Sequence, residues 1–168
     1  MNKLPKLAPH LVVDGGLAAI KFYEDAFDAD TQFLMMAEDG KRVMHAALDV
    51  NDAIIYLCDD FVEGGKPAAK GKAAPARNSA VTIHLNLKKP KHVDAMMQQA
   101  VEHGAQIAMP AEDAFWGDRY GQIRDPFGHI WAFGAPLKHK DQMPAEMPKA
   151  PQAEKTSIPK NRARGSKN

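Results

Sequence analysis

The sequence has a single cysteine, Cys58, among its 168 residues. One cysteine cannot form an intrachain disulfide, and this composition is typical of a reducing compartment such as the cytoplasm. Long apolar runs are missing as well. Residues 1–6 contain no stretch that resembles a signal peptide, and no segment approaches the length of a membrane span. We therefore expect a cytoplasmic protein without a membrane partner.

An excess of charge of one sign is also absent, since 22 Lys and Arg residues face 21 Asp and Glu residues. A balanced charge gives no general electrostatic reason to bind nucleic acid, and we do not expect such a partner. The basic excess lies in residues 138–168, which are rich in Pro, Lys and Ala and poor in large apolar side chains. This composition predicts a flexible basic tail that the rest of the chain does not need for folding.

The remaining chain has two parts of similar length. Residues 63–78 are rich in Gly, Pro, Ala and Lys and show no hydrophobic period, which indicates a linker. The linker separates residues 1–62 from residues 79–137, and the hydrophobic content of 45% is enough for a buried core.

The first part alternates between strand-like and helix-like patterns. A helix is predicted over 17–27 because its apolar residues recur at a spacing of three and four. Asp39-Gly40 lies between two strand-like runs and predicts a hairpin. The predicted order is a strand over 7–13, the helix over 17–27, and strands over 31–37, 42–50 and 53–58.

The second part repeats this order. Pro90 is at a favoured first position for a helix, and Gly104 is suited to end it. The predicted order is a strand over 80–87, the helix, and strands over 106–111, 119–124 and 130–133, with Asp125-Pro126-Phe127-Gly128 as a type I turn. Two βαβββ modules predict an α+β fold whose curled mixed sheets enclose a shared cavity, with the helices outside.

Strand alternation identifies the residues that face the cavity. In 80–87, the apolar residues Val81, Ile83, Leu85 and Leu87 occupy one face, so Thr82, His84 and Asn86 occupy the other. The same rule turns His10 and Tyr56 inward. For 42–50 it predicts that Val43, His45, Ala47 and Asp49 face inward. A concave surface with apolar walls and a few polar groups suits a small ligand.

Four short motifs carry a family resemblance that covers about residues 7–137. They resemble the glyoxalase/bleomycin-resistance/dioxygenase (vicinal oxygen chelate) superfamily, and the last three resemble its PhnB-like branch. The motifs are Ala19-Ile20-Lys21-Phe22-Tyr23, Met44-His45-Ala46, Phe115-Trp116-Gly117-Asp118-Arg119-Tyr120-Gly121 and Asp125-Pro126-Phe127-Gly128-His129-Ile130-Trp131.

The resemblance implies a site for a divalent metal with one ligand from each of four strands. The matching positions in this chain are Ala8, Tyr56, Thr82 and Ala132. None is a histidine or a carboxylate, and alanine has no donor atom, so we expect neither a metal nor another cofactor. A shifted site that uses His10 and His84 together with His45 or Asp49 is the alternative.

Two functions follow as hypotheses. The first is a binding protein that holds a small organic molecule in the sheet-lined cavity without the usual metal. The alternative is a metal-dependent lyase, isomerase or ring-opening dioxygenase, so whether the chain is an enzyme is left open and no catalytic residue is predicted. The resemblance also implies a homodimer. The predicted ligand-binding residues are His10, His45, Tyr56, Thr82, His84, Trp116 and Arg119.

Some of these residues also have a structural interpretation. His10 and His84 are compatible with ordinary core histidines, and His45 with an ion pair to a carboxylate. Trp116 is compatible with simple packing. Arg119 is compatible with a salt bridge to the Asp-Pro-Phe-Gly turn in place of a substrate carboxylate.

Overall fold

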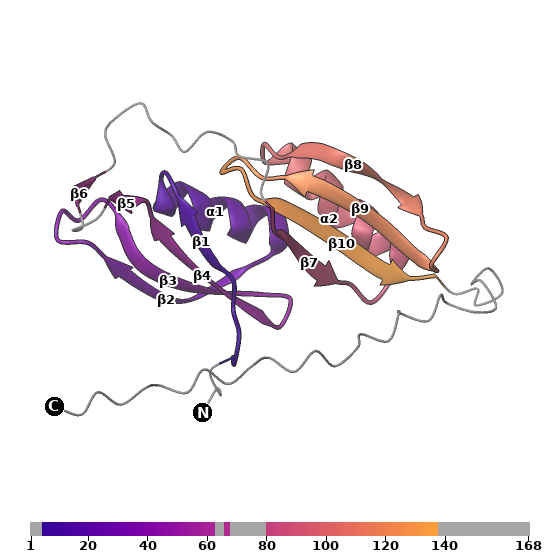
Figure 1. The fold of residues 1–168 in the computed structure, drawn as a ribbon, viewed down its shortest axis with the longest axis horizontal. Helices are drawn as coiled ribbons and strands as arrows, with labels where there is room; N and C mark the ends of the chain where they lie inside the picture. Colours follow the sequence, from indigo (N-terminus) through magenta and orange to yellow (C-terminus); the bar gives the residue numbers. More distant parts are fainter. Residues whose placement is uncertain (1–4, 63–65, 68–79, 138–168) are drawn as a thin grey trace, which may run out of the picture.

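The computed structural model describes residues 5–62, 66–67 and 80–137 of the chain. Within them, two four-stranded mixed sheets and two helices form the α+β fold with two βαβββ modules that the sequence predicts (Figure 1). The predicted tail lies outside the described residues. So does the predicted linker, except for residues 66–67.

The first module contains one helix and one sheet of order β1-β4-β3-β2. Strand β1 is parallel to β4, and the other two pairs are antiparallel. A small two-stranded ribbon follows and reaches into the predicted linker. The elements are β1 (His10–Val13), α1 (Gly16–Phe27), β2 (Asp30–Met36), β3 (Val43–Val50), β4 (Ala53–Asp59), β5 (Phe61–Val62) and β6 (Lys66–Pro67).

The second module has the same connectivity, with sheet order β7-β10-β9-β8 and β7 parallel to β10. The pairing of the outer strand with its neighbour is irregular in both modules, at two places in β2 and two in β8. The elements are β7 (Thr82–Asn86), α2 (Pro90–Glu102), β8 (Gln106–Asp113), β9 (Asp118–Arg124) and β10 (Ile130–Pro136).

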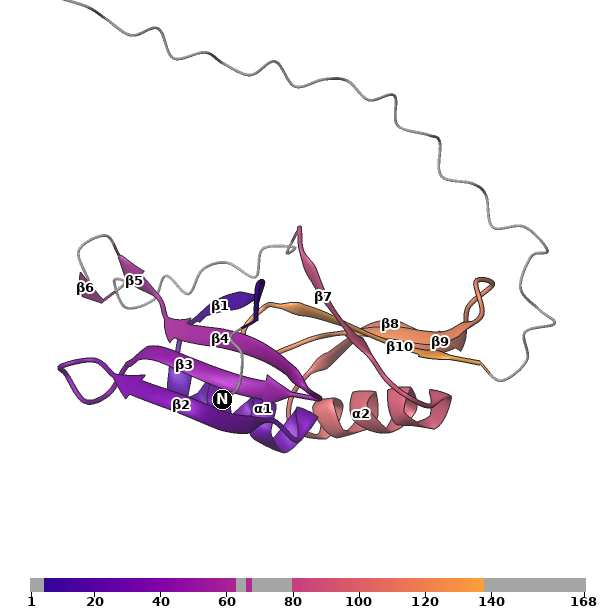
Figure 2. The same ribbon diagram turned by 90° about the horizontal axis from the view of Figure 1, so that it is seen from below.

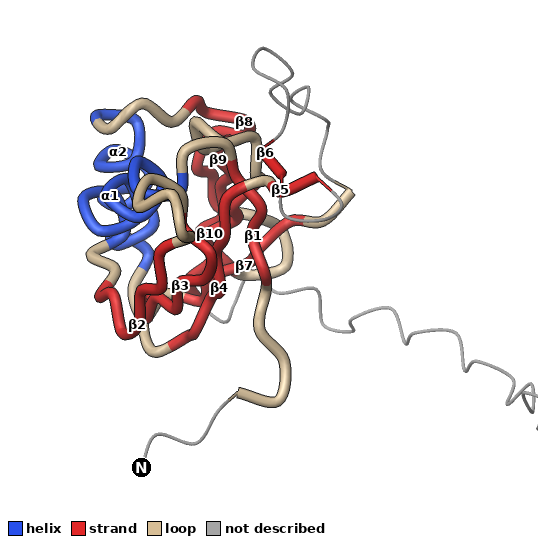
Figure 3. The backbone as a smooth tube through the Cα atoms, turned by 90° about the vertical axis from the view of Figure 1, so that its left-hand side faces the viewer, coloured by secondary structure: helices blue, strands red, loops and turns tan. Residues whose placement is uncertain are grey.

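The two helices lie on the same side of the strands (Figures 2 and 3). Each sheet therefore has one face covered by helices and one turned away from them, which we call the open face. The two sheets do not close into a single barrel. No helix in the described part of the chain is long and apolar enough to cross a membrane.

Helix α1 contributes to the core of both modules. Its Tyr23 and Phe27 are buried, and they pack on Trp131 of β10 with ring centroids 5.5 Å and 4.8 Å away. Phe27 also lies 5.6 Å from Phe133. Aromatic contacts at these distances add to the stabilisation that comes from burial. The cores of the two modules are therefore continuous through this helix.

The predicted Asp-Pro-Phe-Gly turn is present, and its aspartate makes a further set of bonds. Asp125 is buried, and its Oδ2 accepts hydrogen bonds from Tyr23 Oη at 2.7 Å and Trp131 Nε1 at 2.9 Å. Its Oδ1 accepts from the backbone N–H groups of Phe127 and His129. Burial raises the pKa of Asp125, but the hydrogen bonds from His129, Tyr23 and Trp131 outweigh it, so the pKa lies below its ordinary value. Asp125 thus joins the second module to α1.

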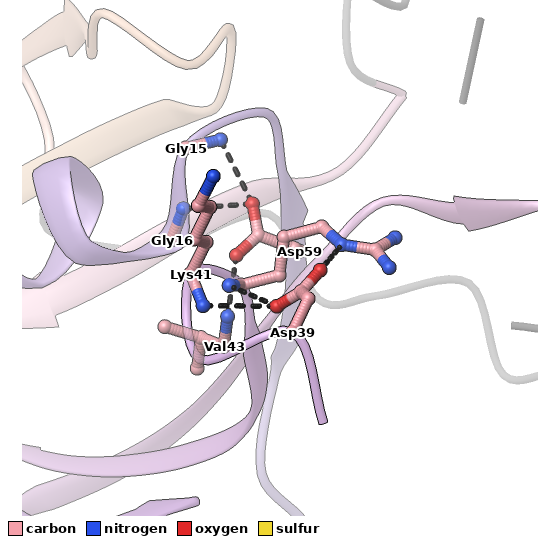
Figure 4. Close-up of polar contacts among 7 residues, drawn as sticks. Gly15, Gly16, Asp39, Lys41, Val43 and Asp59 are labelled. Atoms are coloured by element: carbon pink, nitrogen blue, oxygen red, sulfur yellow. Dashed lines mark hydrogen bonds and ion pairs between the residues drawn. The ribbon is translucent and has the colours of Figure 1, made fainter. Parts of the chain in front are cut away.

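A second buried carboxylate, Asp59, lies at the end of β4 (Figure 4). Its Oδ1 accepts from the N–H groups of Gly15 and Gly16, both at 2.9 Å, and its Oδ2 from the N–H of Val43 at 2.6 Å. A Cβ at Gly16 would lie 2.6 Å from the carboxylate, so a side chain at this position would displace it. Asp59 therefore holds the start of α1 against β3 and β4.

Candidate functional site

Three polar rings meet on the open face of the first sheet. They come from neighbouring strands: His10 from β1, Tyr56 from β4 and His45 from β3, with His10 directly beside Tyr56 in the pairing. The ring centroids of His45 and Tyr56 are 5.0 Å apart, and His10 lies 5.7 Å from His45. Phe33 of β2 adds an apolar ring 6.1 Å from His45. Alternation thus places all three predicted residues on one surface.

One part of the predicted alternation in β3 is wrong. Val43 does not face the cavity: it is fully buried, and its side chain packs beside Gly16. Met44, expected on the apolar face, is exposed. The reason is an irregularity in the pairing of β2 with β3 next to Val43, which interrupts the two-residue period. The alternation holds from His45 onward.

A second cluster lies on the open face of the second sheet. The ring of His84 from β7 is 5.8 Å from Tyr120 of β9, and Tyr120 is 5.5 Å from Trp116. Gln122 Nε2 donates a 2.8 Å hydrogen bond to Tyr120 Oη. Thr82 is two residues before His84 on the same face and is exposed. Tyr120 and Gln122 are not among the predicted residues, although alternation in β9 places them on this face.

The position of His84 depends on a glycine in the neighbouring strand. A Cβ at Gly134 of β10 would lie 2.9 Å from His84 Nε2 and 3.1 Å from Cε1. The imidazole therefore lies directly over the glycine backbone, in space that any side chain at 134 would occupy. This contact holds the ring beside Tyr120.

Arg119 lies on the other face of the same sheet. Its guanidinium binds Asp94 of α2 at 2.6 Å and Asp113 of β8 at 3.1 Å, and these hydrogen bonds raise its pKa. A salt bridge is therefore present, but its partners are these two carboxylates and not the Asp-Pro-Phe-Gly turn. The structure does not bring Arg119 together with His84 and Trp116.

A pocket of about 740 Å³ lies against the first sheet, where the segment before β1 and strand β7 approach it. Tyr56 and His84 line this pocket together, one from each module. Asn51, in the turn between β3 and β4, donates a 3.2 Å hydrogen bond to the carbonyl of Asn86 and so links the modules beside it. The other five predicted ligand-binding residues are not in its walls.

The residues at the positions expected of metal ligands do not fit a metal. Ala8 lies just before β1, and Ala132 of β10 is buried beside His84 in the pairing of β10 with β7. Neither has a donor atom, which leaves Tyr56 and Thr82. In the described part of the chain, no three His, Cys, Asp or Glu side chains are grouped so that they could hold a metal ion. That the protein works without a metal remains a prediction.

The fold defines a class of protein built from paired βαβββ modules. Similar solved structures include the PhnB protein from Bacillus cereus (17% identity, TM-score 0.59, 78% of this chain and 99% of that chain). TioX from Micromonospora sp. ML1 is 22% identical with a TM-score of 0.60, over 80% of this chain and 100% of that chain. The fosfomycin resistance protein FosX from Listeria monocytogenes is 12% identical with a TM-score of 0.58, over 82% and 96%. At these identities the likeness concerns the fold alone.

Sequence comparison identifies the family. Residues 6–133 match the Glyoxalase/Bleomycin resistance protein/Dioxygenase superfamily, and the chain belongs to it. The uncharacterized protein Rv0887c of Mycobacterium tuberculosis is 42% identical over 154 residues, which cover 88% of this chain and 85% of that protein. The uncharacterized protein Mb0911c of Mycobacterium bovis has the same identity over 88% of this chain and 95% of that protein.

Proposed function

We propose that this chain binds a small organic molecule in the pocket against the first sheet, without the metal that enzymes of this fold use. The observation that supports this most directly is that Tyr56 and His84, from different modules, line the same pocket of about 740 Å³. That volume is within the usual range for small-molecule sites. Tyr56 and His84 supply polar contacts, and Phe33 and Ile54 supply apolar walls.

The remaining predicted residues have secondary places in this proposal. His10 and His45 support the Tyr56 ring, and Trp116 and Thr82 lie on the open face that continues from His84. We leave Arg119 out of the binding site because its guanidinium is bound to two carboxylates on the helix side of the sheet.

We further propose that the protein is a homodimer. Large apolar side chains are exposed on both open faces, Phe33 and Met35 on the first and Met109 on the second, with Phe115 on the loop before β9. Apolar groups gathered on one side of a molecule are typical of an association surface. Light scattering coupled to size exclusion should give twice the monomer mass. A monomer at all concentrations would contradict the proposal.

The binding function is tested with a library of small organic compounds. A compound that binds the folded state raises the unfolding temperature. For the best compound, His84→Ala should weaken binding by about tenfold in titration calorimetry, because the ligand loses a polar contact in the pocket wall. His92→Ala is the matched control, since His92 is exposed on α2. Equal weakening by both substitutions would contradict a role for His84.

Elemental analysis separates this proposal from the enzymatic alternative. The binding hypothesis predicts well under one equivalent of zinc, iron, nickel or manganese in protein that is purified without an affinity tag. About one equivalent, lost on His10→Ala or His84→Ala, would favour a metal-dependent lyase, isomerase or dioxygenase.

A further inference from the structure

The walls of the proposed binding pocket are uneven in charge. Its apolar part includes Leu7, Ile54 and Ile83, and its polar part includes Asp49 and Asp52. Among the described residues that line it, none is a lysine or an arginine. A concave surface whose charges are of one sign attracts ligands of the opposite sign.

The pairing of β2 with β3 adds a third carboxylate beside this end of the pocket. Asp30 lies directly opposite Asp49, so the two side chains emerge on the same face of the sheet. Like charges in directly opposite positions destabilise a sheet. Here this arrangement is retained next to a cavity.

The hydrogen-bond partners of these carboxylates are neutral. Gln32 lies in the pairing irregularity of β2, lines the pocket and donates from Nε2 to Asp30 Oδ2 at 2.6 Å. Asp49 Oδ1 accepts from the backbone N–H of Asp52 at 2.9 Å. An amide and a backbone N–H orient the oxygens, but they do not cancel the negative charge.

Aromatic rings border the same cavity. Phe33 and Tyr56 both line it, and Phe33 follows Gln32 directly in β2. Aromatic faces attract cations through the ring quadrupole and pack flat apolar groups. The pocket therefore combines carboxylates, aromatic faces and an aliphatic wall.

We infer that the ligand of this pocket is an organic cation with a flat apolar body, such as an arylalkyl ammonium compound. This inference rests on the proposed binding function and specifies its ligand class. The ammonium group would lie beside Asp49, with the body against Phe33, Tyr56 and the aliphatic wall.

The test uses three probes with one aromatic body and different charge: 1-naphthylmethylammonium, 1-naphthylmethanol and 1-naphthoate. Titration of the full chain at low salt should show that the cation binds about tenfold more tightly than the alcohol, and that the anion binds most weakly. The preference for the cation should shrink as salt is added, because screening weakens the attraction to Asp49.

The Asp49→Asn substitution tests whether the preference for the cationic probe arises in this pocket. The asparagine oxygen can still accept from the Asp52 N–H, so the turn is kept while the charge is removed. The cation should lose most of its advantage, whereas the affinity for the alcohol stays unchanged. Asp14→Asn is the matched control, because it removes the same charge from an exposed residue that does not line the pocket. Asp14 directly follows β1, whereas the pocket wall includes Pro9 just before that strand. In this control the preference for the cation should persist.

The remaining outcomes separate the inference from the proposed function. Equal binding of all three probes overturns the ligand class but leaves the binding function standing. A cation preference that survives Asp49→Asn as well as Asp14→Asn overturns the assignment to Asp49. Binding of none of the three probes contradicts both the ligand class and the proposed use of this pocket.

Discussion

The two modules share one connectivity but use their helices differently. Helix α1 buries residues along most of its length, including Tyr23 and Phe27, which contact Trp131 of the other module. Helix α2 buries Val93, Met97 and Ala100 and leaves the rest more accessible. The repeat is therefore symmetric in topology and asymmetric in packing, because the first helix contacts both sheets and the second packs mainly on its own.

The two buried aspartates show the same difference. The partners of Asp59 are three backbone N–H groups, all within the first module. Asp125 accepts from backbone groups of its own turn and from the side chains of Tyr23 and Trp131, so one of its bonds crosses between modules. One carboxylate holds a module together, and the other also holds the modules to each other.

The largest expected effect is that of Asp125→Ala. The substitution leaves the buried donors of Tyr23 and Trp131 without an acceptor and should lower the free energy of unfolding by about 4 kcal/mol. Urea denaturation followed by tryptophan fluorescence measures it. Asp14→Ala, at an exposed position, should change stability by less than about 0.5 kcal/mol. Equal effects of the two substitutions would contradict a stabilising role for Asp125.

Asp59→Ala should cost less, about 2–3 kcal/mol, because the Gly15 and Gly16 N–H groups at the start of α1 can gain water in its place. The region that is destabilised distinguishes Asp59→Ala from Asp125→Ala. Hydrogen exchange should accelerate at the start of α1 and in β3, whereas β9 and β10 stay protected. Equal acceleration in both modules would show that Asp59 also stabilises the second one.

Tyr23→Phe isolates the bond between the modules. It removes the hydroxyl donor and keeps the packed ring, so the loss should be about 1–2 kcal/mol. In the Asp125→Ala background the same substitution should cost much less, because its acceptor is already gone. Additive effects in this double-mutant cycle, measured by urea denaturation, would mean that the two groups stabilise the fold independently.

The smallest effect concerns pH. A carboxyl whose folded-state pKa is depressed stabilises the protein above its unfolded pKa of about 4, and this contribution is lost as the pH falls through the lower folded value. Asp125 has such a depressed pKa, so stability should fall on acidification below about pH 4. Tyr23→Phe should make this fall shallower, because it removes one hydrogen bond that favours the charged form. An unchanged pH profile would contradict this assignment.

The fold was accessible from the sequence because its signals are local. The helical spacing of Ala19, Ile20 and Tyr23, the Asp39-Gly40 hairpin and the repeated order of elements all agree with the structure. The bonds of Asp59 to Gly15 and Gly16 and the bond of Asp125 to Tyr23 were not accessible, because they join residues far apart in the chain. The Asp-Pro-Phe-Gly motif predicts its turn, but nothing in it specifies Tyr23 as a partner.

The candidate site was predictable only in part. Alternation correctly places Tyr56 and His84 on open faces. Applied to β9, the same rule places Arg119 on the opposite face. Arg119 shares its parity with Ile123, an apolar residue on the helix side, which already separates it from His84. Val43 could not have been placed, since its orientation depends on an irregular pairing with β2.

The irregular pairing of the outer strands also bears on aggregation. A long, flat strand at the edge of a sheet is a template for other chains. Strands β2 and β8 each contain two interruptions of register, and β8 also contains Pro110, which has no N–H to donate. Edges of this kind are poor templates for cross-β assembly. The molecule can therefore present apolar side chains such as Phe33 and Met109 at its outer strands while these strands resist edge-to-edge polymerisation.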